Sequence, residues 1–263
     1  MVNGVSVRRV PLYASHDGSG LRRAANYLSY GVSSSVAGLR HLAGADVVYV
    51  YLTPATAFMA AAVVRTLDRV PVVIHIQDVW PESVTQSSMA PPGHAGRLID
   101  RTLHATMRAV YRMSAGVAVI APSMRELVVS RGADPRTTDV VLNWADEALF
   151  RPVPPTESAR RSIGYRDRCT IMYAGTMGPF QNIEASIRAA AAVADVADLV
   201  LVGSGVEETA ARRLAAGLGA SNIRFLGRRS PIDMAELTGA ADFHLVTLRD
   251  LPMFRGTIPS KLQ

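Results

Sequence analysis

Short apolar runs alternate with longer helical patterns along the chain, and this alternation constrains the fold more than any other feature of the sequence. The runs 47–52, 71–76 and 116–121 are rich in β-branched residues and end at polar or breaking residues, which is typical of buried strands. Helical patterns at 55–67 and 98–113 separate them. Because strands that alternate with helices form βαβ units, the pattern predicts an α/β fold with mainly parallel sheets.

A proline-rich segment divides the alternation into two halves. The first half closes with a short predicted strand at 140–142, and residues 143–155 then contain three prolines without apolar periodicity, which favours a linker. Further strands are predicted at 170–174, 198–202, 223–226 and 243–248, with helices at 183–193, 207–218 and 232–240. A chain of 263 residues is long enough for two domains. We predict two Rossmann-like, doubly wound domains at 1–150 and 151–263, the first without its opening βα unit and the second truncated.

Composition limits the kinds of function. The single cysteine, Cys169, excludes an internal disulfide and a cysteine-based metal cluster. No run of about 18 apolar residues occurs, and the first eight residues lack the apolar core of a signal peptide, so we expect a cytoplasmic chain. The net charge of +6 favours phosphorylated substrates or anionic membrane surfaces. We expect no nucleic-acid partner, because no dense arginine tract with interleaved aromatic residues stands out.

A polar cluster follows the predicted strand 71–76. Ligands in open α/β sheets bind just beyond the carboxyl ends of strands, and the residues at that place are His75, Gln77, Asp78 and Glu82. His75 and Gln77 have the same parity on the strand and point the same way, so both need hydrogen-bond partners from the protein or from a ligand. We interpret the cluster as a candidate site. For His75 alone, a satisfied core histidine is an equal alternative.

Three junctions of the second half carry glycines or arginines just after a predicted strand. The first two contain Gly175 with Gly178, and Gly203 with Gly205; the third contains Arg228. Glycines let a backbone approach a ligand, helix N-termini attract phosphate, and arginines pair with it. No junction fits a dinucleotide or P-loop fingerprint, and plain turns with solvated arginines explain each one alone. Because all three fall at one edge of the same sheet, we expect a nucleotide pocket there.

The segment 21–30 carries arginines beside an apolar and aromatic stripe. Such a segment can lie against a membrane surface or hold a lipid-linked substrate. The alternative is an ordinary amphipathic helix that packs on its own domain. A peripheral contact with the inner face of the plasma membrane is therefore one expectation for the first domain.

Six short motifs occur in an order that resembles a known family. They are Ile76–Ser83, Asn143–Asp146, Tyr173–Gly178, Val202–Gly205, Phe225–Gly227 and Ile258–Leu262. The series is similar to that of bacterial family 4 glycosyltransferases of the GT-B fold, close to the branch that builds capsule, colanic-acid or O-antigen sugars. The resemblance covers nearly the whole chain and rests on the ordered set, since no single motif is decisive.

The resemblance implies two facing Rossmann-like domains that transfer a sugar with retention and without a metal or other cofactor. The donor would be a nucleoside-diphosphate sugar, with UDP favoured by family habit, and the acceptor would be lipid-linked or a saccharide. The implied donor-binding residues are Gly175, Gly178, Gln181, Asn182, Gly203, Gly205, Arg228, Ser260 and Lys261. Lys261 would supply positive charge to the leaving phosphates. The cluster of His75, Gln77, Asp78 and Glu82 would face the sugar and acceptor as the catalytic side.

The chain departs from the family pattern in several places. Gln77 stands where the commoner form has a histidine, and Gln181 and Asn182 occupy the region of the usual arginine and lysine. The family's paired glutamates, seven residues apart, would follow Lys261 beyond Gln263, and the opening glycine-rich loop of the first domain is missing. We therefore expect a chain that is incomplete at both ends and has weak or no turnover alone.

Two other functions fit the sequence. One is a non-catalytic sugar-nucleotide-binding subunit that needs a partner chain, for which UDP binding without transfer would be the sign. The other is a nucleotide-sugar epimerase of similar architecture, which would convert the donor with no acceptor present. A dinucleotide oxidoreductase is disfavoured, because the G-x-G-x-x-G fingerprint is absent.

Overall fold

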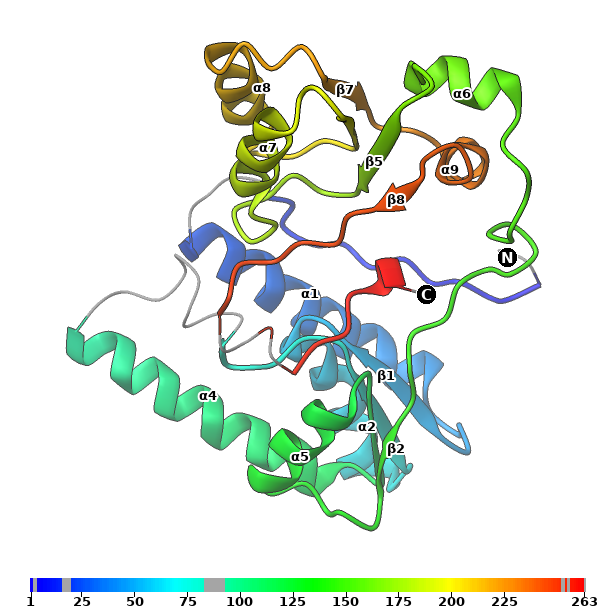
Figure 1. The fold of residues 1–263 in the computed structure, drawn as a ribbon. Helices are drawn as coiled ribbons and strands as arrows, with labels where there is room; N and C mark the ends of the chain where they lie inside the picture. The colour runs from blue at the N-terminus through cyan, green and yellow to red at the C-terminus, as the bar shows by residue number, and fades with distance from the viewer. Residues whose placement is uncertain (2–3, 16–19, 83–92, 252–253, 255, 263) are drawn as a thin grey trace. The chain divides into compact units, whose positions relative to one another are not determined.

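A computed structural model describes residues 1, 4–15, 20–82, 93–251, 254 and 256–262 (Figure 1). The chain divides into two compact units, Met1–Leu142 with Arg255–Ile258 and Asn143–Phe254 with Pro259–Gln263. The first unit thus ends at Leu142 rather than at residue 150, and the proline-rich segment belongs to the second unit. Ser83, the last residue of the first motif, lies outside the described residues.

The first unit contains a parallel sheet in the order β1-β2-β3-β4. Its strands are β1 (Val48–Leu52), β2 (Val72–Ile76), β3 (Gly116–Val119) and β4 (Thr138–Val140). Along β1 buried and exposed residues alternate, whereas β2 is buried at nearly every position. The alternation along β1 is that expected of an edge strand with one face open to solvent. Leu52 pairs with Ile76, so the carboxyl ends of β1 and β2 lie side by side.

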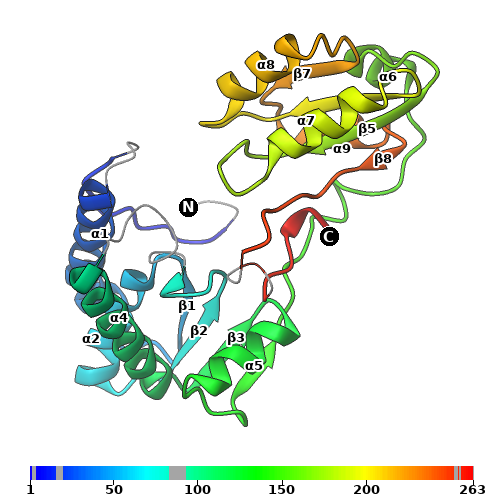
Figure 2. The ribbon, with the colours of Figure 1, turned by 60° about the vertical axis from the view of Figure 1, so that its left-hand side comes forward.

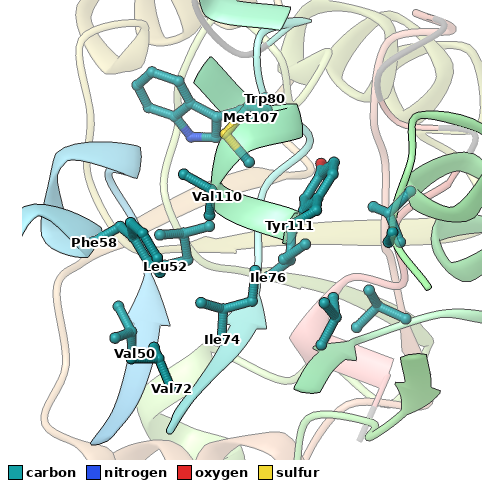
Figure 3. Packing of buried hydrophobic residues seen from close by; sticks show 14 of the residues in the cluster. Val50, Leu52, Phe58, Val72, Ile74, Ile76, Trp80, Met107, Val110 and Tyr111 are labelled. Carbon is teal, nitrogen blue, oxygen red and sulfur yellow. The ribbon is translucent and has the colours of Figure 1, made fainter. Parts of the chain in front are cut away.

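Helices cover one face of this sheet. They are α1 (Gly20–His41), α2 (Phe58–Asp68) after the 3-10 turn η1 (Ala55–Ala57), α4 (Gly93–Met113) and α5 (Pro122–Ser130). Because β1 to β4 are added in one direction, right-handed crossovers place α2, α4 and α5 on the same face. Figure 2 shows α1, α2 and α4 together on one side of β1 and β2. The core between them contains Leu52, Ile74, Ile76, Phe58, Met107, Val110 and Tyr111 (Figure 3).

The second unit is a parallel sheet in the order β7-β6-β5-β8 with helices on both faces. Its strands are β5 (Cys169–Ala174), β6 (Ala197–Val202), β7 (Ile223–Gly227) and β8 (Phe243–His244), and its helices are α6 (Glu157–Ile163), α7 (Ile183–Ala192), α8 (Glu208–Gly217) and α9 (Pro231–Thr238). Neighbouring residues of β6 enter different cores: Leu201 packs with α7 and α8, and Val202 packs with α6 and α9. This division is the doubly wound arrangement that the alternation predicts.

A buried carboxylate fixes the amino end of β6. Asp198 accepts hydrogen bonds from Arg166 at 2.5 and 3.0 Å and from Arg224 at 3.2 Å, and Arg168 Nε lies 3.5 Å away. Burial raises the pKa of Asp198, but the three guanidinium groups outweigh it and hold that pKa below its ordinary value. This Asp198 cluster lies at the opposite end of the strand from Val202.

Several elements differ from the predictions, and α6 was not predicted. The helix α4 begins at Gly93 rather than at 98, β4 covers Thr138–Val140 rather than 140–142, and β8 ends at His244 rather than at 248. Strand pairing sets the last two bounds, because β4 exists only where it pairs with β3, and β8 only where it pairs with β5. No helix in the described part of the chain is long and apolar enough to cross a membrane.

Candidate functional site

A pocket of about 940 Å³ opens at the carboxyl ends of β5 and β6 in the second unit. Five of the residues predicted to bind the donor line it, namely Gly175, Gly203, Arg228, Ser260 and Lys261. Its size is in the range of small-molecule and cofactor sites, which run from roughly 300 to 1,000 Å³. The pocket lies beyond the carboxyl ends of the strands, where ligands bind in open α/β sheets.

Two turns meet on the floor of this pocket with almost no space between their backbones. A Cβ atom added to Gly203 would lie 1.9 Å from the carbonyl oxygen of Gly175, and Gly203 has a φ of +132°. The amide of Gly175 donates to Val202 O, and the amide of Gly203 donates to Gly227 O, each at 2.8 Å. A side chain at residue 203 would therefore separate the turns. We call this contact the glycine crossing.

Four other predicted donor-site residues, in the turns after β5 and β6, are absent from the pocket lining. Gly178 N donates to Gln181 Oε1 at 3.1 Å, so the Gln181 side chain is used inside its own loop. Asn182 precedes α7 with a left-handed φ of 53° and makes no side-chain cap. A Cβ atom on Gly205 would lie 2.2 Å from Met177 O, so this glycine also permits a backbone contact.

Lys261 contributes a partly buried positive charge to the pocket wall. Its Nζ lies 2.9 Å from the hydroxyl oxygen of Tyr173 and 4.0 Å from the centroid of that ring. Burial lowers the pKa of Lys261. Arg228 and Arg229, which follow β7, are exposed and also line the pocket. The pocket thus presents three cationic side chains to a ligand.

Sequence reasoning missed several residues of the wall. Trp144, Asp146 and Phe150 line the pocket, although only the motif Asn143–Asp146 pointed to this region and no role was inferred from it. His244 lines it as well, with its Nε2 3.0 Å from Thr238 O. His244 gave no local signal, because its place depends on how the short strand β8 pairs with β5.

In the first unit, the structure separates the polar cluster into an inner and an outer part. His75 is fully buried, and Gln77 is nearly so. His75 Nδ1 lies 2.5 Å from the Tyr49 hydroxyl, and His75 Nε2 lies 3.1 Å from Gln77 Nε2. Burial lowers the pKa of His75, which favours the neutral ring. In neutral His75 one ring nitrogen donates a hydrogen bond and the other accepts one, so Tyr49 and Gln77 meet nitrogens of opposite character.

The outer part consists of Asp78 and Glu82, which have different partners. Asp78 is exposed and accepts a hydrogen bond from Thr53 Oγ1 at 3.2 Å. Glu82 forms a bidentate ion pair with Arg131, which also donates to Trp80 O at 3.1 Å. Of the predicted catalytic residues, Asp78 is thus the one that is open to solvent, and the catalytic role of the whole cluster stays a prediction. Among the described residues, no group of three or more His, Cys, Asp or Glu is arranged to hold a metal ion.

Comparison with known proteins identifies the first unit. A sequence model described as "Glycosyl transferase 4-like domain" matches residues 1–144, which is more than half of the chain. The chain belongs to the glycosyl transferase 4-like family. This membership confirms the resemblance to family 4 glycosyltransferases that the ordered motifs indicated.

One curated protein and two solved structures are similar to most of the chain. The probable glycosyltransferase WbjE of Pseudomonas aeruginosa is 25% identical over 218 residues, which make up 82% of this chain and 54% of that protein. The crystal structure of Anabaena Alr3699/HepE with UDP and glucose matches with a TM-score of 0.64, at 18% identity, over 84% of this chain and 58% of the other. The structure of WaaG, a glycosyltransferase involved in lipopolysaccharide biosynthesis, matches with a TM-score of 0.63, at 20% identity, over 92% of this chain and 62% of the other. These likenesses confirm the predicted α/β GT-B class, and the chain spans somewhat more than half of each relative.

Proposed function

We propose that this chain belongs to a retaining glycosyltransferase whose second unit binds a UDP-sugar, and that the sugar passes to a lipid-linked or saccharide acceptor in cell-envelope polysaccharide synthesis. One observation carries the proposal: in a chain of the glycosyl transferase 4-like family, Lys261, Arg228 and Arg229 line one pocket beside the glycine crossing. As the glycosidic bond breaks, negative charge develops on the leaving diphosphate, and cations already in position stabilise it. Bare backbone at the crossing lets phosphate oxygens approach.

The relatives support the nucleotide and the setting. Alr3699/HepE was crystallised with UDP and glucose, which supports a UDP donor for a chain of the same fold. WaaG takes part in lipopolysaccharide biosynthesis, which supports a role in the cell envelope. We propose no metal or other cofactor, because the three cationic side chains supply charge at the pocket that a metal ion would otherwise bring. Unchanged transfer in the presence of EDTA is the expected result.

A peripheral membrane contact at the cytoplasmic face is the second part of the proposal, and α1 supports it. This helix packs on α2 through small residues: a Cβ atom on Gly31 would lie 2.5 Å from the sulfur of Met59. Away from that face it carries large apolar residues that are 49% to 86% exposed, at positions Leu21, Leu28, Val32, Val36 and Leu39. Their spacing places them in one stripe along the helix. A stripe of this kind fits the interface of a lipid bilayer.

The distribution of charged residues along the chain favours binding of the first unit to an anionic membrane surface. Residues 1–142 carry 14 basic and 9 acidic side chains, a net +5, whereas 143–263 carry 14 and 13, a net +1. On α4, the exposed arginines at 97, 101, 108 and 112 fall on one face at helical spacing. Each arginine near an anionic membrane adds roughly 1 kcal/mol of attraction. Flotation with anionic and zwitterionic vesicles tests this contact. We expect the chain to bind only anionic vesicles, and we expect Arg101→Gln but not Arg136→Gln to weaken that binding. Equal binding to both kinds of vesicle, or binding to neither, would refute the contact.

Calorimetric titration of UDP into the chain tests the donor site. We expect UDP to bind, and the double variant Arg228→Ala/Arg229→Ala to bind at least about tenfold more weakly, since hydrogen bonds to charged groups contribute roughly 1.5–3 kcal/mol each. Arg213→Ala, an exposed arginine of α8 outside the pocket, is the matched control. A chain that does not bind UDP, or that loses nothing in the double variant, would overturn the assignment.

Product analysis tests the reaction itself. Incubation of the protein with a radiolabelled UDP-sugar and a membrane lipid extract should give a labelled lipid or saccharide, whose anomeric configuration matches that of the donor by NMR. Conversion of the donor without acceptor would instead indicate an epimerase. UDP binding with no transfer under any acceptor would indicate a sugar-nucleotide-binding subunit.

A further inference from the structure

Lys261 is held in one place by a tyrosine from the middle of the unit. The ammonium group lies both within hydrogen-bond distance of the Tyr173 hydroxyl, at 2.9 Å, and over the face of the same ring, 4.0 Å from its centroid. We propose that Tyr173 is a positioning residue that fixes the Lys261 ammonium in the pocket to meet the diphosphate of the donor. The inference rests on the proposed UDP-sugar site and adds to it Tyr173, which is not among the donor-binding residues that the resemblance implies.

The hydrogen bonds of the Tyr173 hydroxyl determine which partner it donates to and which it accepts from. Its hydroxyl donates to Thr176 O at 2.6 Å, so its only proton is already used and its oxygen is left to accept from Lys261. Tyr173 is fully buried, and burial raises its pKa to about 12, so the hydroxyl stays neutral at physiological pH. A neutral partner orients the ammonium without cancelling its charge. Among the described residues, Lys261 forms no ion pair, so its charge is available to an anionic ligand.

The glycine at 175 makes this placement possible. A Cβ atom added to Gly175 would lie 2.6 Å from Cε and 2.8 Å from Nζ of Lys261. The end of the lysine side chain therefore passes directly over the bare backbone of residue 175. Tyr173, Gly175 and Thr176 come from the end of β5 and the turn after it, so one short segment builds the whole support for a lysine 88 residues away.

The charge of Lys261 should respond to a bound anion. Burial lowers its pKa because the ammonium form is poorly solvated, and the Tyr173 oxygen offsets part of this cost by accepting its hydrogen bond. A diphosphate beside the ammonium favours the charged form, so UDP should raise the pKa of Lys261. Removal of the Tyr173 hydroxyl should lower it in the free protein.

The sequence offers a direct measurement, because Lys261 is the single lysine of the chain. Protein made with ¹³C- and ¹⁵N-labelled lysine gives one side-chain signal, which can be titrated with pH by NMR with and without UDP. Tyr173→Phe keeps the ring and removes the hydroxyl. Tyr165→Phe is the matched control, since Tyr165 lies in the same unit but not in the pocket lining.

We expect UDP to raise the pKa of Lys261 in the wild-type chain and in Tyr165→Phe. In Tyr173→Phe the free-state pKa should fall, and the affinity for UDP should drop by about tenfold, as for the loss of one hydrogen bond to a charged group. A Tyr173→Phe variant that matches Tyr165→Phe in pKa and in affinity overturns the inference. If Tyr173→Phe does not fold, the wild-type chain still decides: UDP that binds by calorimetry without raising the pKa of Lys261 refutes the positioning role and leaves the donor site standing. No UDP binding at all refutes the proposed function.

Discussion

The substitution Gly203→Ala tests the glycine crossing most sharply. The added Cβ atom would lie 1.9 Å from the carbonyl oxygen of Gly175, a distance that real Cβ atoms do not show. The φ of +132° at Gly203 is also one that a residue with a side chain rarely adopts. The two turns must therefore move apart, whichever residue yields.

The cost can be worked from the groups at the crossing. Holding a residue with a side chain at this φ costs about 1–3 kcal/mol. Separation of the turns weakens the hydrogen bonds from Gly175 N to Val202 O and from Gly203 N to Gly227 O, which contribute about 0.5–1.5 kcal/mol each. We expect Gly203→Ala to lower the free energy of unfolding by about 3 kcal/mol. UDP binding should also fall, because the floor of the pocket is displaced.

A second glycine provides the matched control. Gly217 lies at the end of α8, its φ is not in the left-handed range, and a Cβ atom there would meet nothing within 4 Å. Gly217→Ala should therefore leave UDP binding unchanged and stabilise the chain by up to about 1 kcal/mol. Urea denaturation followed by circular dichroism measures both variants. If the free energies of unfolding of Gly203→Ala and Gly217→Ala differ by less than about 0.5 kcal/mol, the close approach of the two turns is refuted.

Two further sites give predictions of stability. Asp198→Asn should lower the free energy of unfolding by about 2–3 kcal/mol, which is less than for a fully buried ion pair because the three arginines are 23% to 44% exposed. Glu184→Gln, which removes one member of a surface ion pair, should lower it by under about 0.5 kcal/mol. Equal losses in the two variants would contradict this prediction. Because the pKa of Asp198 is lower in the folded state, its contribution to the free energy of unfolding is complete above its unfolded pKa near 3.9 and is lost as the pH falls through the lower folded value. Acid titration of the wild-type chain should therefore show a loss of stability that Asp198→Asn lacks. Tyr49→Phe should lower the free energy of unfolding by about 1 kcal/mol, because it removes the hydroxyl that pairs with His75 Nδ1. Tyr51→Phe, on the same face of the strand, should change it little. A lower melting temperature for Tyr51→Phe than for Tyr49→Phe would exclude the pairing.

The sequence predicts the fold well where the signal is local. Alternating strand and helix patterns give the two parallel sheets, and the proline-rich segment marks the junction between them. The short strands β4 and β8 are misplaced, because each is defined by the neighbour to which it pairs rather than by its own residues. Isolated apolar runs of this length carry no information about pairing partners.

The pocket of the second unit shows the same limit. Its glycines are predictable because turns after parallel strands must carry residues without side chains wherever two backbones meet. The support of Lys261 is not predictable, because Tyr173 looks like any apolar strand residue and its partner comes 88 residues later. Likewise, Gln181 is predicted to bind the donor, but the structure places its carboxamide oxygen on Gly178 N. A motif gives the region of a site, whereas the three-dimensional contacts decide which of its side chains remain free.

At the polar end of β2, strand parity and strand register together explain which side chains are paired and which is exposed. Parity alone requires that His75 and Gln77 share a face and find hydrogen-bond partners, and the structure supplies them from each other and from Tyr49. Tyr49 can serve because the register pairs Tyr51 with His75, which brings the residue two positions earlier into diagonal reach. The ladder of β1 and β2 ends at Leu52 and Ile76, so Asp78 lies beyond the last pair and is free of the sheet. An edge-strand tyrosine thus satisfies the histidine inside the sheet, and Asp78 is left as the member of the cluster whose carboxylate is exposed, beside Thr53.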